Sequence, residues 1–374
     1  MRVWAFEKGE QEIAMNDIKA ITKKKIEKIM SEIDILRQRT VENLLPAKML
    51  KCGYKTDNTL PEPDETWEVL GENTRIGGRD NHCWIYTEFK TPKAENPNEE
   101  FRLTLNGGQA HGFFEGFVPC RNPQCILYVN GKMVQGLDMK HTDYVLEADT
   151  EYKVHIYYYS GLYDTDYKIG LSVIKTDLRL EQLYYDLFLP YDALTVYNDD
   201  EFEYTETLKH LDIAVNFLDF TVPYSDEFFE GAENASKYLY ENYYGKYNSF
   251  AAIADCTGHT HIDVAWLWTY GQTKEKVQRS FSTVVSLMKR YPEYKFMISQ
   301  PQLLEFLKEE APEMYGEVKK LISEGRIEVE GAMWVEADGN LPSGESFVRQ
   351  ILFGKRFIKE EYNTDSTILW LPDL

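Results

Sequence analysis

A histidine and an aspartate two residues apart form the first pair in this sequence whose types and spacing could do chemistry. His261 and Asp263 lie in the segment GHTHIDVAWLW, shortly after an apolar segment typical of a buried strand. In extended backbone, residues two apart point to the same side. An imidazole and a carboxylate on one side suit Zn²⁺ among other divalent ions. We interpret both as candidate metal ligands, with His259 as either a third ligand or a donor that orients Asp263.

Predicted strands and helices alternate in the last third of the chain, which is typical of a parallel sheet or part of a barrel. Short apolar segments predict the strands, and amphipathic segments predict the helices between them. In chain order they are a strand at 250–256, a helix at 272–291, a strand at 295–299, a helix at 301–325 with a break near Pro312, a strand at 326–334, a helix at 344–362 and a strand at 366–371.

Polar residues follow each of these strands, as at a reactive rim where the carboxyl ends of parallel strands meet. The second strand leads into SQPQ, with Gln300 and Gln302. The third leads into MWVEADGNLPSGE, with Glu336 and Asp338, and the fourth into WLPD, with Asp373. Three of the four strands thus deliver carboxylates. This convergence is the strongest physical indication of a site in the sequence.

The same carboxylates also have a purely structural interpretation. Glu336 and Asp338 could belong to a polar loop before the helix at 344–362, with Ser343 as the N-cap of that helix. Asp373 could lie in a surface turn, since carboxylates are usually exposed. Spacing alone does not separate these alternatives.

The first two thirds of the chain predict a different architecture. Apolar spacing predicts a helix over 16–45, and 177–248 is again helical, limited by Pro190 and Pro223. Between them, short strands separated by turns, with Asn130-Gly131 as a hairpin turn, indicate a β-sandwich. The predicted domains are a helical segment at 1–47, a carbohydrate-binding-like β-sandwich at 48–176, a helical connector at 177–248 and a truncated catalytic α/β barrel at 249–374.

Aromatic residues of the predicted sandwich have two interpretations. Trp67, Trp84 and Tyr86 could stack on a sugar ring, as in a carbohydrate-binding module. Buried aromatics are the commoner case, so we expect a core role.

Composition excludes several classes of protein. With 374 residues, 43% of them hydrophobic, the chain can form packed cores and is not disordered. The formal net charge of −21 repels nucleic acid and anionic membranes. No apolar run approaches the roughly 18 residues that span a bilayer, and the first residues do not form a secretory signal. Five cysteines without a CxxC pair predict reduced thiols in the cytoplasm: Cys52, Cys83, Cys120, Cys125 and Cys256.

The segments GHTHIDVAWLW, GAMWVEADGNLPSGESFVRQ and WLPD resemble the N-terminal catalytic region of glycoside hydrolase family 38, the retaining α-mannosidases. The resemblance is closest to the cytosolic and bacterial branch and covers 256–373, with weaker similarity before it. It implies a (β/α)7-type barrel and one zinc ion. By motif position, His261 and Asp263 would be zinc ligands, and Asp373 would be both a zinc ligand and the catalytic nucleophile.

The resemblance also implies a reaction. Zinc would hold the O2 and O3 hydroxyls of a terminal α-linked mannose and favour a flattened ring, while Asp373 attacks the anomeric carbon and a second carboxyl group protonates the leaving oxygen. Trp268, Trp334, Glu336 and Asp338 would face the substrate oligosaccharide.

The family pattern extends past Leu374. Its fourth zinc ligand, a histidine, and its acid/base aspartate lie in that further part, so we expect this chain to be an N-terminal fragment that is inactive alone. An open sheet edge at 366–371 could pair with a second copy and give a homo-oligomer.

Two alternatives remain at this point: a metal-dependent polysaccharide deacetylase, which also places Asp and His ligands in a barrel, and a non-catalytic carbohydrate-binding module. The segment WVEADGNLPSGE favours the mannosidase.

Overall fold

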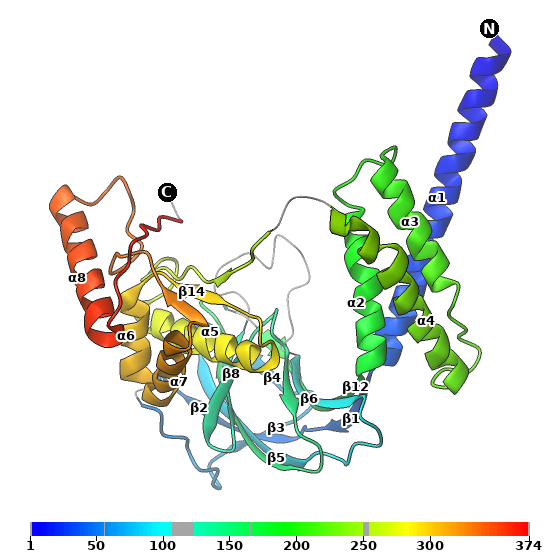
Figure 1. Cartoon of the computed structure of the whole chain (residues 1–374). Helices are drawn as coiled ribbons and strands as arrows, with labels where there is room; N and C mark the ends of the chain where they lie inside the picture. Colours follow the sequence, from blue (N-terminus) through cyan, green and yellow to red (C-terminus); the bar gives the residue numbers. More distant parts are fainter. Residues whose placement is uncertain (1, 56, 107–122, 165, 250–253, 373–374) are drawn as a thin grey trace.

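The computed structural model consists of a helical bundle, a β-sandwich and an α/β unit, and it describes residues 2–55, 57–106, 123–164, 166–249 and 254–372. For 2–16 and 247–249 the backbone alone is described. The bundle and the α/β unit lie at opposite ends of the sandwich (Figure 1). None of the described helices is long and apolar enough to span a bilayer.

The helical bundle joins both predicted helical regions into one body. It contains α1 (Arg2–Arg37), α2 (Leu178–Ala193), α3 (Phe202–Val215), α4 (Asp226–Asn242) and the short 3₁₀ helix η1 (Tyr244–Ser249). Residues from α1 to α4 share one apolar core, which includes Ile33, Leu183, Leu211 and Phe228. The sequence predicts 1–47 and 177–248 as two separate domains. The structure places their helices in one bundle instead, because α1 buries its apolar stripe against α2, α3 and α4.

Two local predictions in this region are wrong. The helix expected over 16–45 ends at Arg37, and the chain continues directly into a strand, β1 (Gln38–Asn43). Pro190 does not limit α2, which continues to Ala193. A proline inside a helix leaves the carbonyl four residues earlier without its N–H partner. Here the Tyr244 hydroxyl donates to the Asp186 carbonyl at 3.0 Å and satisfies it.

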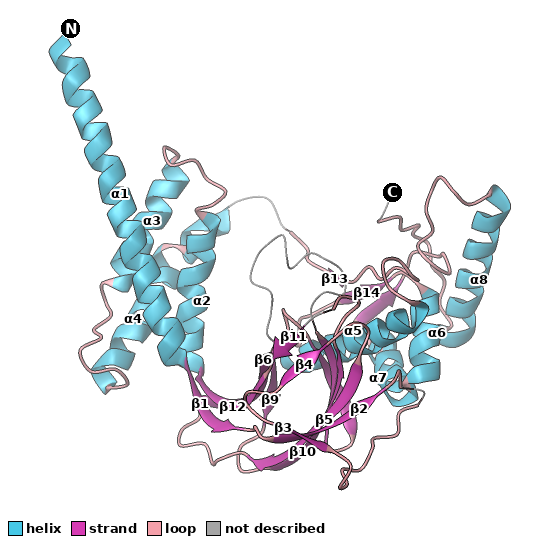
Figure 2. Ribbon diagram, turned by 180° about the vertical axis from the view of Figure 1, so that it is seen from behind, coloured by secondary structure: helices cyan, strands magenta, loops and turns pink. Residues whose placement is uncertain are grey.

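The β-sandwich is formed by two antiparallel sheets, shown in magenta in Figure 2. The first sheet has the order β1, β12 (Gly170–Asp177), β6 (Glu99–Asn106) and β9 (Asp143–Leu146). The second has the order β3 (Glu68–Leu70), β2 (Ala47–Cys52), β5 (His82–Lys90), β10 (Glu151–Tyr159), β7 (Gln124–Val129) and β8 (Lys132–Leu137), and a separate pair joins β4 (Arg75–Gly77) to β11 (Asp166–Lys168). Apolar residues of both sheets form one core, which confirms the predicted sandwich architecture.

The predicted hairpin and the predicted aromatic core are both present in the second sheet. Asn130 and Gly131 join β7 to β8 with φ angles of 48° and 84°, which glycine and asparagine tolerate best. Trp67, Trp84 and Tyr86 are buried, with 8%, 6% and 8% exposure, in an aromatic cluster on the other face of this sheet. They cannot stack on a sugar without opening the core.

The α/β unit contains β13 (Gly258–His259), α5 (Tyr270–Arg290), β14 (Phe296–Ile298), α6 (Pro301–Glu310), α7 (Pro312–Ser323), β15 (Ile327–Val329) and α8 (Gly344–Tyr362). The strands are parallel in the order β13, β14, β15, with an apolar core between sheet and helices. The helices lie where the sequence predicts them, including the break at Pro312. The described residues form an open parallel sheet, and the closed barrel stays a prediction.

The two outer predicted strands differ from expectation. Of the strand predicted at 250–256, residues 254–256 are not in a strand and 250–253 lie outside the described residues. The segment 366–371 contributes one parallel bridge, between Leu369 and Gly331. The side chain of Glu330 explains why this segment pairs at one residue only. Its Oε2 accepts hydrogen bonds from the backbone N–H groups of Thr367 and Ile368 at 3.2 and 3.3 Å. Those donors are then not free for a sheet ladder.

The sandwich packs directly on α5 through a buried polar cluster. Glu275, which is fully buried, lies 3.2 Å from His82 Nε2 and accepts a hydrogen bond from the Tyr157 hydroxyl at 3.1 Å. A Cβ at Gly136 of β8 would lie 2.8 Å from Arg279 Cβ, so only glycine allows this close approach. The sandwich therefore supports the helix that follows the histidine-rich segment.

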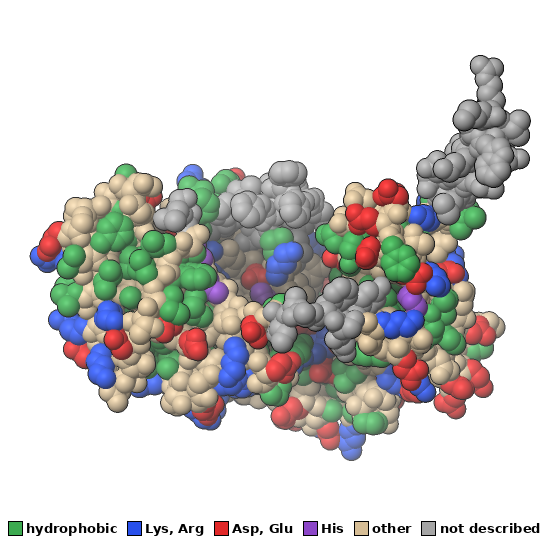
Figure 3. All heavy atoms as spheres, turned by 45° about the horizontal axis from the view of Figure 1, so that its top comes forward, with side chains coloured by type: hydrophobic (Ala, Val, Ile, Leu, Met, Phe, Trp, Pro, Cys, Tyr) green, Lys and Arg blue, Asp and Glu red, His purple; other side chains and the backbone are tan. Residues whose placement is uncertain are grey.

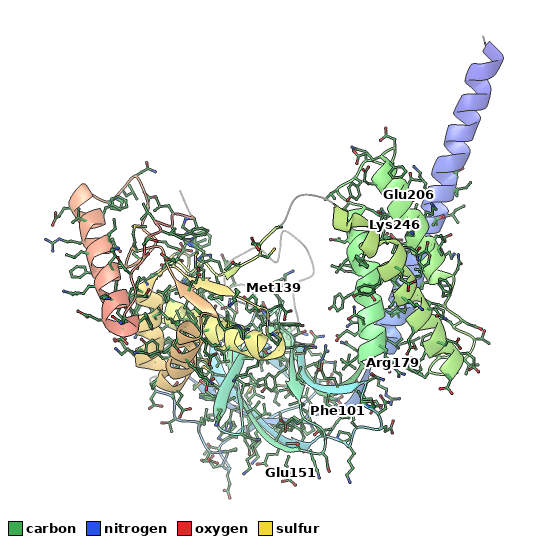
Figure 4. The ribbon with its side chains drawn as sticks, viewed as in Figure 1. Phe101, Met139, Glu151, Arg179, Glu206 and Lys246 are labelled. Carbon is green, nitrogen blue, oxygen red and sulfur yellow. The ribbon has the colours of Figure 1, made fainter. Side chains whose placement is uncertain are left out.

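A buried ion pair joins the sandwich to the bundle. Figure 4 labels two residues close to it in sequence, Phe101 of β6 and Arg179 of α2. Arg102 of β6 donates two hydrogen bonds to Glu181 of α2, at 2.7 and 2.6 Å, and its side chain is 5% exposed. Paired, planar geometry of this kind is the strong form of an ion pair.

We predict that Arg102→Ala destabilises the chain by about 3 kcal/mol, the lower end for a broken buried pair, because Glu181 loses its two shortest hydrogen bonds but keeps Arg37 at 3.3 Å and Arg290 at 3.8 Å. The measurement is the shift of the urea unfolding midpoint, followed by circular dichroism. The matched control is Arg75→Ala, whose partner Asp166 is exposed; it should change stability by at most about 1 kcal/mol. Equal effects of both substitutions would contradict the assignment.

Candidate active site

The ends of the three parallel strands bring the predicted site residues of the α/β unit together. His259 ends β13, and His261 and Asp263 follow it in the loop before α5. Ser299 and Gln300 follow β14, and Glu336 follows β15 after a short turn. Because the strands are parallel, these segments meet at one rim.

Glu336 is the most buried carboxylate of this rim, with a side chain only 2% exposed. It accepts hydrogen bonds from His261 Nδ1, from the Ser299 hydroxyl and, at 2.9 Å, from Gln300 Nε2. Its backbone N–H donates to Gln300 Oε1 at 3.2 Å. A carboxylate can be buried only when its oxygens are satisfied in this way. Ser299 is a residue of the site that the sequence analysis did not single out.

The other ring nitrogen of His261 faces Asp263. Nε2 lies 3.2 Å from Asp263 Oδ1, and the two side chains are 28% and 26% exposed. Burial lowers the pKa of His261, but hydrogen bonds and charge from Glu336 and Asp263 outweigh it and raise this pKa above its ordinary value. Carboxylates accept on both sides of the ring, so Nε2 needs a proton or a cation between itself and Asp263.

His259 lies against the other side of the same group. Its Nε2 is 2.7 Å from Ser299 Oγ and 3.6 Å from Glu336 Oε1. Burial lowers its pKa, which favours the neutral ring. The hydrogen bond of His259 is to Ser299, and its two roles, as a third metal ligand or as a donor that orients Asp263, stay predictions.

The loop from His261 to α5 is held by hydrogen bonds from both of its sides. Gln300 Nε2 donates to the Ile262 carbonyl at 3.0 Å, and Thr273 Oγ1 donates to the Asp263 carbonyl at 3.3 Å. Trp268 Nε1 donates to Thr273 Oγ1 at 3.1 Å. Trp268 thus helps to anchor the loop, whatever else it contacts.

A cavity of about 380 Å³ lies beside this loop, between the α/β unit and the sandwich. Trp268, His259 and His261 line it together with Asp138 and His141 from the turn between β8 and β9. The sandwich therefore contributes side chains to the surroundings of the candidate site.

Trp334 and Asp338 have structural contacts of their own. Trp334 Nε1 donates to Gln302 Oε1 at 2.8 Å, and its ring packs edge-on against Phe357 of α8. Asp338 accepts from two backbone N–H groups of its own turn, which lowers its pKa, and Ser343 caps α8 as the structural interpretation expects. Their predicted contact with substrate stays a prediction.

The donor set fits one divalent ion in part. Nε2 of His261 and Oδ1 of Asp263 are 3.2 Å apart, and two ligands of a tetrahedral ion at about 2.1 Å would be about 3.4 Å apart. Among the described residues, no group of three His, Cys, Asp or Glu could hold a metal. Asp373, the third predicted ligand, lies outside the described residues. The described pair can therefore contribute to a metal site but does not complete one.

Comparison with known proteins finds one family and several relatives. Residues 253–374 match the model of the glycosyl hydrolases family 38 N-terminal domain. Alpha-mannosidase G of Dictyostelium discoideum is 28% identical over 385 residues, covering 94% of this chain and 34% of that protein. Alpha-mannosidase of Saccharomyces cerevisiae is 33% identical over 54% of this chain and 19% of its own length. Human alpha-mannosidase 2C1 is 45% identical over 31% of this chain and 11% of its own length.

These matches confirm the family resemblance that the motifs indicate. The chain spans about a third of the length of the Dictyostelium relative, and less of the other two. A solved acetyl xylan esterase from Butyrivibrio proteoclasticus is similar over 38% of this chain and 32% of that chain, with 13% identity and a TM-score of 0.19, which is too low to indicate the fold.

The aspartate of the cavity gives a pH-dependent prediction. Burial raises the pKa of Asp138, but hydrogen bonds from His141 and from backbone N–H groups outweigh it and bring this pKa down to about 2. A carboxyl group whose pKa is lower in the folded than in the unfolded chain stabilises the fold at every pH above its unfolded pKa. This stabilisation is lost as the pH falls from the unfolded pKa to the folded pKa. The loss of stability caused by Asp138→Asn should therefore be largest at neutral pH and shrink between about pH 4 and 2. Urea unfolding at several pH values measures this loss, and Asp199→Asn, at an exposed position, is the control and should change stability by no more than about 0.5 kcal/mol.

Proposed function

Since residues 253–374 match the model of the glycosyl hydrolases family 38 N-terminal domain, we propose that the whole protein is a retaining, zinc-dependent α-mannosidase. Its substrates are oligosaccharides with terminal α-linked mannose. The observation that carries the proposal is that the segments matching the family are those whose polar residues meet at one rim: His261 with Asp263, and Glu336. The four described cysteines are free, which supports a reducing compartment, the cytoplasm.

His261 and Asp263 would hold the zinc ion through Nε2 and Oδ1, the two atoms that face each other. Bound there with Asp373, zinc would hold two neighbouring sugar hydroxyls and favour the flattened ring of an oxocarbenium-like transition state. Leu369, four residues before Asp373, forms a parallel bridge with Gly331, which follows β15. The chain that leads to Asp373 therefore has the same direction as β15. That direction supports delivery of Asp373 to the same rim as Glu336.

The carboxylate of Asp373 would then attack the anomeric carbon and form a glycosyl–enzyme bond as the leaving oxygen departs. A second carboxyl group would give its proton to that oxygen, and water would later break the glycosyl–enzyme bond with net retention. By family resemblance, the acid/base lies in the part of the relatives that this chain does not span. We propose, accordingly, that residues 1–374 are inactive alone.

Exposed apolar residues support a larger α/β unit. Leu341 is 87% exposed, and Val348 and Leu352 of α8 are 59% and 58% exposed. Figure 3 shows hydrophobic side chains gathered over this unit. Only Gly354 and Ile358 of α8 are buried. We propose that further strands and helices of the whole protein close the barrel and cover this face; if they do not, pairing of two copies would cover it.

Zinc should stabilise the chain through the described pair. A ligand at 100 times its Kd stabilises the folded state by about 2.7 kcal/mol, which raises the unfolding temperature. His261→Ala should remove this zinc-dependent rise, because it removes one of the two described ligands. Thermal unfolding by circular dichroism, with zinc and then with a chelator, measures the effect. His141→Ala, a half-exposed histidine of the same cavity, is the matched control and should keep the rise. No rise in the unsubstituted chain, or the same rise in His261→Ala, would count against the metal site.

Asp373→Ala in the whole protein should lower kcat on an activated aryl α-mannoside by about a thousandfold or more, because it removes the nucleophile. The matched control is Asp365→Ala, an exposed aspartate eight residues earlier, which should keep kcat. Residues 1–374 alone should show no turnover. The first product, followed by proton NMR, should be the α-anomer of mannose. A near-normal kcat for Asp373→Ala, or an initial β-anomer, would refute the retaining mechanism at this residue.

A further inference from the structure

The buried carboxylate of Glu336 holds the ring of His261 from behind. His261 Nδ1 donates to Glu336, and the opposite ring atom, Nε2, points to Asp263. Two carboxylates compete for the ring: Glu336 lies against Nδ1, and Asp263 lies 3.2 Å from Nε2. The contact with Glu336 is the shorter one, and the Glu336 side chain is 2% exposed against 26% for Asp263, so a single ring proton belongs on Nδ1. When the ring is neutral, Nε2 then carries the lone pair. The environment of Glu336 thus selects one of the two tautomers of His261.

The position of Glu336 is itself fixed by Gln300. The Gln300 side chain donates from Nε2 to Glu336 at 2.9 Å and to the Ile262 carbonyl at 3.0 Å. Its Oε1 accepts from the Glu336 backbone N–H at 3.2 Å. One buried amide therefore connects the carboxylate to the backbone next to His261. The Glu336 carboxylate cannot move away from the backbone at Ile262 without breaking these bonds.

Ser299 extends the same chain of hydrogen bonds to His259. The Ser299 hydroxyl donates to Glu336, so its oxygen is left to accept from His259 Nε2, 2.7 Å away. All of these donors converge on a side chain that is 2% exposed, where water does not compete for them. With three donors already bound, Glu336 has no oxygen directed to solvent for a sugar hydroxyl. Its burial argues against the substrate-facing role that the family resemblance implies.

We propose that Glu336 is a positioning residue that fixes His261 in the Nδ1–H tautomer and aims its Nε2 lone pair at the space beside Asp263. This inference rests on the proposed function, in which that space holds a zinc ion. A carboxylate behind a ligating imidazole orients the ring and makes its free nitrogen a better donor. Ser299 and Gln300 serve this purpose by holding the carboxylate in place.

The first test is the tautomer of His261 in residues 1–374, by nitrogen-15 NMR of the imidazole rings at alkaline pH, without metal. His261→Ala assigns the signal. In the unsubstituted chain the proton should be on Nδ1. In Glu336→Leu, which keeps the size but removes the acceptor, the Nε2–H form should dominate. A merely structural role of Glu336 would lower stability in this variant without moving the proton.

The second test is zinc affinity of the same chain, by competition with a chromophoric chelator. Glu336→Gln keeps the shape and one acceptor but removes the charge, and it should weaken zinc binding about 10- to 100-fold. Ser299→Ala should fall between Glu336→Gln and the unsubstituted chain. The matched control is Glu328→Gln, an exposed glutamate of the adjacent strand β15, which should bind zinc as the unsubstituted chain does.

The outcomes separate this inference from the proposed function. If the unsubstituted chain binds zinc and folded Glu336→Gln binds it within twofold, the positioning role is wrong and the metal site stands. If the unsubstituted chain binds no zinc, the proposed metal site falls, and the tautomer of His261 alone decides the positioning role. If Glu336→Leu does not fold, the affinity of Glu336→Gln decides it. An Nε2–H tautomer in the unsubstituted chain would overturn the inference.

Discussion

A buried negative charge must be surrounded by donors, and this requirement organises the rim of the α/β unit. Removing a carboxylate from water is costly unless each oxygen accepts hydrogen bonds. Glu336 meets this condition only because donors arrive from the ends of β13 and β14. The strands are short, so side-chain hydrogen bonds beyond their ends hold the rim where the ladder does not reach. The arrangement of His261 follows from satisfying Glu336.

Much of the α/β unit is predictable because its signals are local. The helix at 344–362 is present as Gly344–Tyr362, since its apolar period and the Ser343 cap lie within one segment. The break at Pro312 has the same origin. The spacing of His261 and Asp263 predicts that their side chains lie on the same side, and Nε2 and Oδ1 are 3.2 Å apart in the structure, while their role as metal ligands stays a prediction. The strand at 366–371 was overestimated because its pairing depends on Glu330, which is remote in sequence and takes the N–H groups a ladder would use.

The role of Glu336 could not be read from the sequence for a related reason. In the segment WVEADGN it resembles its neighbour Asp338, and both look like residues of a polar loop. The fold separates them: Asp338 turns back on its own backbone, while Glu336 enters the interior. What distinguishes the two is the supply of donors from Ser299 and Gln300, which lie about forty residues earlier. The continuation of α2 past Pro190 likewise depends on a hydroxyl from another helix, that of Tyr244.

The fully buried Glu275 of α5 has a consequence for how such a chain can be rearranged in evolution. Its partners His82 and Tyr157 belong to the sandwich, on strands that come long before α5 in the chain. If an α/β unit of this kind were joined to an unrelated N-terminal domain, the carboxylate of Glu275 would lose the hydrogen bond from Tyr157 and the contact with His82. Both halves must therefore be inherited together, or the glutamate must be replaced when they part. The sandwich and the α/β unit are in this sense one unit of inheritance. An insertion between them is tolerated only where it leaves their contact surface intact.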